Sequence, residues 1–238
     1  MATIVLIPGA WFTPAIYEPF LKAFNSHGHP THYAGYPSLD PINPTIADCK
    51  TDTDVIARTL RSLVEDEGRD IVLVMHSYAG MPGAAAAKGL GKVERKREGR
   101  SGGVLGMVFI AAFLVPEGAS CAGLQGGSLP DWILLDNPFP DLNIPKDPVG
   151  DFAQPAPAWA DDEYAGRLAM IVTTADKAVP QEAQHGMVTA TQKEWIIKEI
   201  QDCTHCGPFM NRLGESVGLI LAILDRFAAQ TDKVLSCI

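Results

Sequence analysis

Apolar runs that are typical of buried strands alternate along this chain with segments of helical periodicity, and this alternation restricts the fold more than any other feature. The strand-like runs lie at about residues 4–7, 71–75, 104–114, 169–173 and 195–200, with a short extended piece at 31–34. The helical segments lie at about 14–27, 52–67, 80–90 and 209–229. Continuous apolar strands separated by helices are typical of parallel sheets covered on both faces. The sequence therefore predicts an α/β fold with a mostly parallel sheet and helices on both faces.

Length and charge restrict the class of protein further. The 238 residues fit one domain that can hold a hydrophobic core without disulfides. A net charge of −9 repels phosphate backbones and anionic membrane surfaces, so we expect neither nucleic acid nor a membrane as partner. The chain shows no export signal and no apolar run of the ~18 residues that a membrane span needs. Together with an odd number of cysteines, five, this favours a cytoplasmic protein with reduced thiols.

Residues 116–165 differ in character from the rest of the chain, which we take to be a single domain spanning 1–238. This stretch is rich in Pro, Gly and Asp and shows only weak periodicity. Long irregular insertions in compact domains usually serve function, often as lids. We therefore expect a small cap over the active site, with Trp132 and Trp159 among its apolar contacts. An irregular surface excursion is the alternative.

Ser77 is the candidate nucleophile. It stands at the end of a strand-like run and before an Ala-rich helical segment, within the sequence Met-His-Ser-Tyr-Ala-Gly. A serine hydroxyl is a weak nucleophile, and a sharp strand-to-helix turn exposes it above the end of a parallel sheet. Such turns usually read G-x-S-x-G, because small residues let backbone segments pass closely. Here Met75 replaces the first glycine and Ala79 the second, so the match is partial.

His205 is the candidate base among six histidines. It follows the strand-like run 195–200 and precedes the last helix, and residues beyond the carboxyl ends of parallel strands gather at one edge of the sheet. The other histidines are His27, His29 and His32 in a polar loop, His76 beside the nucleophile and His185 in a helical segment. The loop histidines are expected in solvent and His76 is expected to pack in the turn.

Asp176 is the candidate acid, which would orient the imidazole of His205 and stabilise its cation. It follows the strand-like run 169–173, and the interval before His205 leaves room for one helix and one strand. The order serine, acid, histidine is one of the known chain orders of such triads. A helix N-cap role for Asp176 is the alternative. Asp202 is a rival acid, but it lies too near His205 in sequence to reach the far ring nitrogen easily.

Two backbone N–H groups near the nucleophile are expected to form an oxyanion hole. One belongs to Tyr78, and the other to Ala10 or Trp11 in the loop after the first strand, where Gly9 permits a tight bend. Aromatic side chains are expected to line the substrate pocket near the same edge: Trp11, Phe113, Trp132 and Phe209.

Other motifs carry less weight. Cys203-Thr204-His205-Cys206 contains C-x-x-C with a histidine, but no further ligand at matching spacing supports a zinc site. The pair also lacks the setting of a thioredoxin-like redox motif. The glycines do not form G-x-G-x-x-G after a strand, so a dinucleotide site is unsupported. We therefore expect no metal and no cofactor.

Five segments together resemble a known family: IVLIPGAW, VLVMHSYAG, FIAAFLVPEG, TTADKAVPQEAQ and HCGPFM. They are similar to the α/β-hydrolase family that includes plant methyl-ester esterases and hydroxynitrile lyases, and most similar to its small fungal and bacterial members. The resemblance implies the α/β-hydrolase fold and no cofactor. The site residues that it implies are Ser77, Asp176 and His205 as triad, with the amides of Ala10 and Tyr78 as oxyanion hole. Cys206 and Gly9 stand where the plant lyases have lysine and threonine, which argues against cyanohydrin cleavage.

Three functions are compatible with these residues. The first is hydrolysis of an ester or lactone of a small apolar molecule through an acyl-enzyme. The alternative is a lyase, C–C-cleaving or cyclising reaction of secondary metabolism, with His205 as base in the same pocket. The third is a non-catalytic binder of small molecules, which an intact Ser/Asp/His set disfavours. The expected partner is a small-molecule substrate, and homodimer formation is left open.

Overall fold

A parallel sheet forms the centre of the molecule. The computed structural model describes residues 1–39, 47–124 and 154–237. Within these ranges six strands lie in the order β2-β1-β3-β4-β5-β6, every neighbouring pair parallel. The strands are β1 (Thr3–Ile7), β2 (Thr31–Tyr33), β3 (Asp70–His76), β4 (Gly103–Ile110), β5 (Leu168–Thr173) and β6 (Ile196–Ile200). The predicted α/β class is confirmed.

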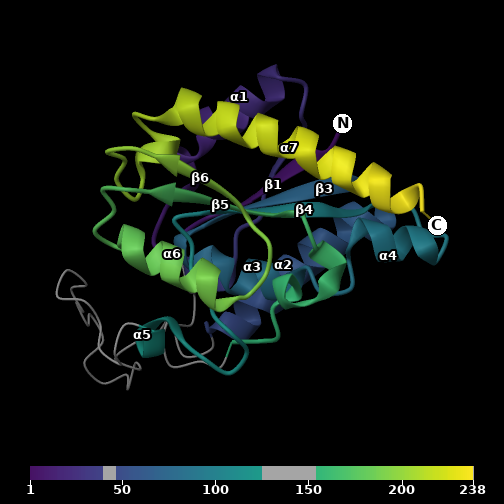
Figure 1. The fold of residues 1–238 in the computed structure, drawn as a ribbon, viewed down its shortest axis with the longest axis horizontal. Coiled ribbons are helices and arrows are strands. Elements are labelled where there is room, and N and C mark those ends of the chain that lie inside the picture. Colours follow the sequence, from purple (N-terminus) through teal and green to yellow (C-terminus); the bar gives the residue numbers. More distant parts are fainter. Residues whose placement is uncertain (40–46, 125–153, 238) are drawn as a thin grey trace.

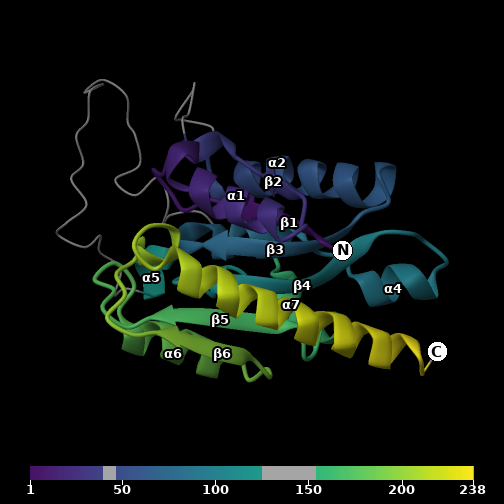
Figure 2. The ribbon, with the colours of Figure 1, turned by 90° about the horizontal axis from the view of Figure 1, so that it is seen from above.

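Helices cover both faces of this sheet (Figure 1). α1 (Glu18–Ser26) and α7 (Leu213–Leu235) lie on one face, and α2 (Cys49–Arg61), α3 (Pro82–Ala86) and α6 (Gln181–Ala190) on the other. Seen from above in Figure 2, α7 crosses β4 and β5, whereas α1 lies towards β1 and β2. The shorter elements are α4 (Lys92–Arg97), α5 (Cys121–Leu124), the π-helical η3 (Ser62–Asp66), and the 3-10 turns η1 (Pro14–Ile16), η2 (Pro37–Leu39), η4 (Ser77–Gly80), η5 (Ala158–Ala160), η6 (Asp162–Tyr164) and η7 (Gly207–Phe209).

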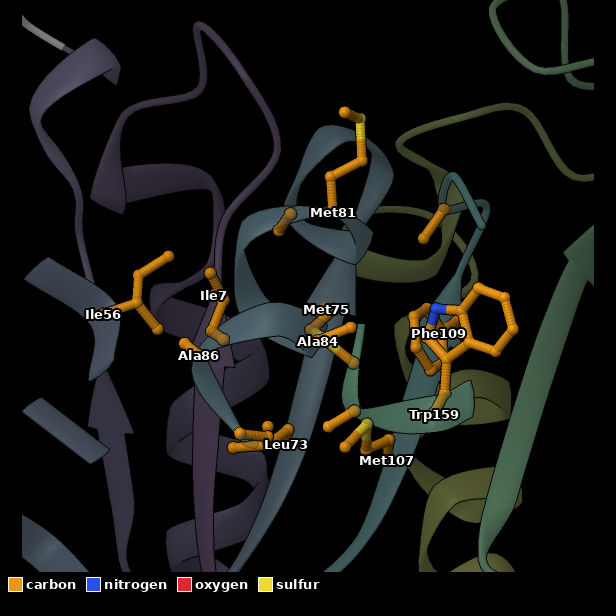
Figure 3. Close-up of a cluster of buried hydrophobic side chains, with 14 of the residues drawn as sticks. Ile7, Ile56, Leu73, Met75, Met81, Ala84, Ala86, Met107, Phe109 and Trp159 are labelled. Carbon is orange, nitrogen blue, oxygen red and sulfur yellow. The ribbon is translucent and has the colours of Figure 1, made fainter. Parts of the chain in front are cut away.

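Each face of the sheet has its own hydrophobic core because the central strands are apolar on both sides. On the α1 and α7 face, Phe20 and Phe227 are fully buried against the sheet. On the other face, Ile56 of α2 and Phe109 of β4 belong to a second core (Figure 3). Trp159, expected as a cap contact, lies in this second core beside Phe109, with 6% of its surface exposed.

The predicted cap falls mostly on residues 125–153, which lie outside the described residues together with Trp132. The chain that follows them packs onto the body of the fold. The buried Gln154 donates from its side chain to the carbonyl oxygen of Met81 at 2.9 Å and accepts from Cys49 Sγ at 3.1 Å.

Several predicted boundaries differ from the observed ones for local reasons. α2 begins at Cys49 rather than near residue 52, because Asp48 and Thr51 form a reciprocal capping box. β4 ends at Ile110 rather than at residue 114, since Ala111 adopts a left-handed φ of 46° that turns the chain out of the sheet. The last helix begins at Leu213, after the separate turn η7, rather than at Phe209.

Candidate active site

Ser77 occupies a strained turn at the carboxyl end of β3. Its φ is 55°, a left-handed value that is uncommon and costly for a residue with a Cβ atom. The turn passes so close to the segment that follows β4 that a Cβ on Gly80 would lie 2.3 Å from the carbonyl oxygen of Phe113. The N–H of Phe113 in turn donates to the carbonyl oxygen of Ser77 at 3.0 Å. The neighbouring backbone therefore holds the serine in its strained conformation, partly exposed at the sheet edge.

Met75 is accommodated in this turn by a glycine elsewhere in the sequence. Its side chain is fully buried and points into the core between β3 and α3 (Figure 3). A Cβ on Gly83 of α3 would lie 2.8 Å from Met75 Sδ and 2.7 Å from Ile7 Cδ1. Because Gly83 has no side chain, α3 leaves room for the side chain of Met75, and the turn accommodates methionine at a position that is usually glycine.

Asp176 and His205 form a hydrogen-bonded pair at the same edge of the sheet. Their atoms Oδ2 and Nδ1 lie 2.7 Å apart, the carboxylate side chain is fully buried, and 15% of the imidazole is exposed. Asp176 follows the end of β5 and His205 follows the end of β6, with α6 between the two strands, which matches the predicted spacing. Because Asp176 holds Nδ1, the Nε2 atom of His205 remains the nitrogen that can serve as base.

The carboxylate of Asp176 is held in place by three further donors. Oδ1 accepts from the backbone N–H groups of Ala178 and Val179 at 2.8 and 2.9 Å, and Oδ2 accepts from the Thr173 hydroxyl at 2.8 Å. Burial alone would raise the pKa of Asp176, but the hydrogen bond and charge of His205 and these donors lower it overall. Asp176 is therefore ionised and immobile, as an acid that orients an imidazole must be. The rival Asp202 is exposed and lies in a left-handed turn.

The loop after β1 runs directly against the nucleophile. A Cβ on Gly9 would lie 2.8 Å from His76 Nδ1 and 3.2 Å from Ser77 Cβ, so only glycine fits here. Ala10 follows and is buried, whereas Trp11 has a left-handed φ of 64° and is 56% exposed. Ala10 is thus buried directly after the glycine that contacts the nucleophile turn, and the indole of Trp11 is exposed.

Tyr78, whose amide is the other expected oxyanion donor, is anchored through its side chain. The hydroxyl donates to Asp52 Oδ2 at 2.8 Å, and Asp52 also accepts from the backbone and hydroxyl of Ser38 at 3.0 and 2.5 Å. Asp52 is fully buried, and burial raises its pKa despite these hydrogen bonds. Sequence reasoning missed Asp52, because a carboxylate near a helix start is normally a surface residue.

The remaining predicted pocket residues differ in position. Phe113 is partly buried and lies beside Ser77 through their backbone hydrogen bond. Phe209 is 1% exposed, with its ring centroid 4.9 Å from Tyr17, 5.0 Å from Phe20 and 4.7 Å from His76. Phe209 therefore packs behind His76 as part of the core rather than on an open surface.

The cysteines near His205 do not gather ligands. Cys203 is free, buried against Gly207, and burial raises its pKa to about 11. Within residues 1–39, 47–124 and 154–237, no three His, Cys, Asp or Glu side chains come together as a metal site. In the same ranges, no helix combines the length and the apolar character needed to cross a bilayer.

This arrangement of a serine turn after a central parallel strand, with an acid and a histidine after later strands, defines the α/β-hydrolase class of proteins. Residues 4–215 match the model of the Alpha/beta hydrolase family, and the chain belongs to that family.

Two curated fungal proteins are similar over part of the chain. The "Alpha/beta hydrolase nvfD" of Aspergillus novofumigatus is 30% identical over 122 residues, which cover 50% of this chain and 46% of that protein. The "Probable hydrolase R7" of a Phoma species is 29% identical over 125 residues, 52% of this chain and 48% of that protein. The matched stretch thus spans about half the length of these relatives.

Solved structures share the fold over nearly the whole chain. A pyrethroid hydrolase, PytH, superposes with a TM-score of 0.67 at 16% identity, covering 94% of this chain and 97% of its own. An extracellular α/β-hydrolase from a Paenibacillus species gives 0.67 at 16%, covering 94% and 99%. Tomato methylketone synthase I gives 0.63 at 16%, covering 95% and 99%. At these identities the likeness shows the fold alone.

Proposed function

We propose that this chain is a serine hydrolase that cleaves an ester or lactone of a small apolar molecule through an acyl-enzyme. The observation that carries the proposal is the shared edge of the sheet. Ser77 projects there from a strained turn, and the buried Asp176 holds His205 by a 2.7 Å hydrogen bond in the segment after β6. Fold alone does not choose a reaction, so the proposal rests on these side chains.

In the proposed reaction, His205 Nε2 takes the proton of Ser77 as its oxygen attacks the substrate carbonyl. Asp176 stabilises the resulting imidazolium, and the amides of Ala10 and Tyr78 bind the developing oxyanion. His205 then protonates the leaving alcohol. A water molecule, deprotonated by the same histidine, releases the acid and restores the serine.

The apolar character of the substrate is inferred from the surface beside the nucleophile. Trp11 presents an exposed indole next to the expected oxyanion loop, and the backbone of the partly buried Phe113 is hydrogen-bonded to that of Ser77. Among the proteins of the same fold, one is named a pyrethroid hydrolase and another polyneuridine aldehyde esterase. These names, a hydrolase and an esterase, agree with the proposed type of reaction without assigning a substrate to this chain.

The test combines a burst assay with covalent labelling. The wild-type protein is expected to release a burst of nitrophenol from p-nitrophenyl acetate and to add one phosphonyl group from a fluorophosphonate probe, located on Ser77 by mass spectrometry. Ser77→Ala should lose both, whereas Ser236→Ala, at an exposed serine of the C-terminal end, should keep both. Retention of the burst in Ser77→Ala defeats the proposal. Turnover without a trappable acyl-serine would favour the lyase or cyclising alternative.

A further inference from the structure

A chain of three hydrogen bonds, two of them made by His76, joins separate segments of the site. The N–H of Gly9 donates to the Tyr17 hydroxyl at 2.9 Å, and that oxygen lies 2.8 Å from His76 Nδ1. On the other side of the ring, His76 Nε2 lies 3.1 Å from the carbonyl oxygen of His205. His76 itself is the residue before Ser77, so one fully buried imidazole contacts the oxyanion loop, the nucleophile turn and the base.

For a neutral His76 ring, these partners allow only one arrangement of protons along the chain of bonds. A carbonyl oxygen can only accept, so His76 Nε2 must carry the hydrogen that it donates to His205. In a neutral imidazole Nδ1 then has no hydrogen and must accept one, which the Tyr17 hydroxyl donates. The Tyr17 oxygen in turn accepts from Gly9. Every donor has an acceptor, and each group has its single required role.

We propose that neutral His76, acting with Tyr17, is a positioning residue that fixes His205 and the Gly9 loop relative to Ser77. This inference rests on the proposed serine mechanism. The contact to His205 is made through the backbone, so it sets where the base stands without using the ring atoms that do chemistry. The contact through Tyr17 sets the loop that carries the Ala10 amide.

The groups packed around His76 hold its ring in place and disfavour its protonation. Its ring lies between Phe12, at a centroid distance of 5.4 Å, and Phe209, at 4.7 Å. Burial, and then the neighbouring His205, lower the pKa of His76 well below its usual value. The two imidazoles are 4.7 Å apart, but among the residues that the structure describes only His205 of this pair has a carboxylate partner. The proton taken from Ser77 therefore stays on His205, and the positioning bonds survive the reaction.

The first test removes the Tyr17 hydroxyl and leaves its ring. Tyr17→Phe should lower kcat for an activated ester by about 10- to 100-fold with KM within about 3-fold, because sub-ångström displacement of catalytic groups costs rates of this order. Tyr33→Phe is the matched control. Its ring lies 6.3 Å from that of Tyr17, and its buried hydroxyl has no hydrogen-bond partner among the described residues. Equal kcat values in the two variants would overturn the proposal.

The second test separates hydrogen bonding from bulk. His76→Gln offers an amide donor and an acceptor in one plane and should retain kcat within about 10-fold, whereas His76→Leu should lose about 100-fold. If Tyr17 acts through His76, adding Tyr17→Phe to His76→Leu should cost little more than His76→Leu alone. Fully multiplicative losses, or equal losses in the Gln and Leu variants, would count against the positioning role.

The third measurement does not depend on activity. In protein labelled with ¹⁵N-histidine, His76 should show a neutral ring with the hydrogen on Nε2 between pH 5 and 8, in the wild type and in Ser77→Ala. Hydrogen on Nδ1, or protonation of the ring within this range, refutes the proposed network. Retained activity in Ser77→Ala would instead defeat the serine mechanism, so the two failures are distinguishable.

Discussion

Replacing Asp176 by asparagine should disable His205 by fixing the wrong tautomer. The Oδ1 position accepts two backbone N–H groups, from Ala178 and Val179 at 2.8 and 2.9 Å, so the asparagine oxygen must occupy it. The amide nitrogen then occupies the Oδ2 position, 2.7 Å from His205 Nδ1. An NH₂ group donates, so Nδ1 must accept and the ring hydrogen moves to Nε2. The nitrogen that faces the serine can then no longer take its proton.

The expected loss follows from the role of this tautomer. Loss of the correct tautomer in a serine triad lowers kcat by roughly 10⁴-fold, which corresponds to about 5 kcal/mol of transition-state stabilisation. The assay is steady-state hydrolysis of p-nitrophenyl acetate between pH 6 and 10. The rate of Asp176→Asn should rise with hydroxide concentration, because hydroxide then takes the serine proton in place of His205.

The matched control is Asp202→Asn, at the exposed rival acid, which should keep kcat within about 2-fold because it removes a surface charge only. Thermal unfolding of both variants checks that the fold persists. If Asp176→Asn retains kcat within 10-fold, or if Asp202→Asn shows the larger loss, the assignment of the acid is wrong.

Two further predictions concern stability. The folded-state pKa of His76 is depressed, so the unfolded chain binds the additional proton and stability is lost as pH falls below the unfolded value of about 6.5. Between pH 6.5 and 5, the free energy of unfolding should therefore fall more steeply in the wild type than in His76→Gln, by up to about 1.4 kcal/mol per pH unit. Urea unfolding at several pH values measures both. The same dependence of unfolding free energy on pH in the two proteins would contradict this. Gly83→Ala should destabilise by about 1–3 kcal/mol, because its Cβ would lie 2.7 Å from Ile7 Cδ1 and 2.8 Å from Met75 Sδ. In a Met75→Ala background this cost should fall by about 1 kcal/mol, since the contacts with Met75 are gone, alanine is the better helix former, and only the contact with Ile7 Cδ1 remains. An unchanged cost in the double-mutant cycle would show that Gly83 does not accommodate Met75.

The fold could be predicted from the sequence because its signal is local. β3 consists of Asp-Ile-Val-Leu-Val-Met-His with all but its first residue buried, and such a run has few other stable placements. The same holds for the alternation of strands and helices, which leaves a parallel sheet as the simplest arrangement. Errors occurred at ends, where single residues decide. The polar segment before residue 52 gave no periodicity, and only its capping box extends α2 to Cys49.

The site could be predicted only where chain order carries information. Ser77, Asp176 and His205 each follow a strand, and parallel strands end at one edge, so their gathering there follows from topology. The donors that hold Asp176 lie within three residues of it, but the carboxylate that anchors Tyr78 comes from elsewhere in the chain and has no sequence signal of its own. Asp52 accepts hydrogen bonds from Ser38 and Tyr78, and neither contact follows from any spacing.

The two histidines of the site show why contacts, and not residue type, assign chemical roles. His76 and His205 have the same side chain, and their ring centroids lie 4.7 Å apart. One ring nitrogen of His205 faces a buried carboxylate that favours a positive charge. Both ring nitrogens of His76 face neutral groups, a hydroxyl and a carbonyl, and an uncharged ring gives every donor among them an acceptor. In the proposed reaction, Asp176 therefore balances the positive charge that forms on His205. The roles of the two histidines are thus set by their hydrogen-bond partners, and exchanging those partners would exchange the roles of His76 and His205.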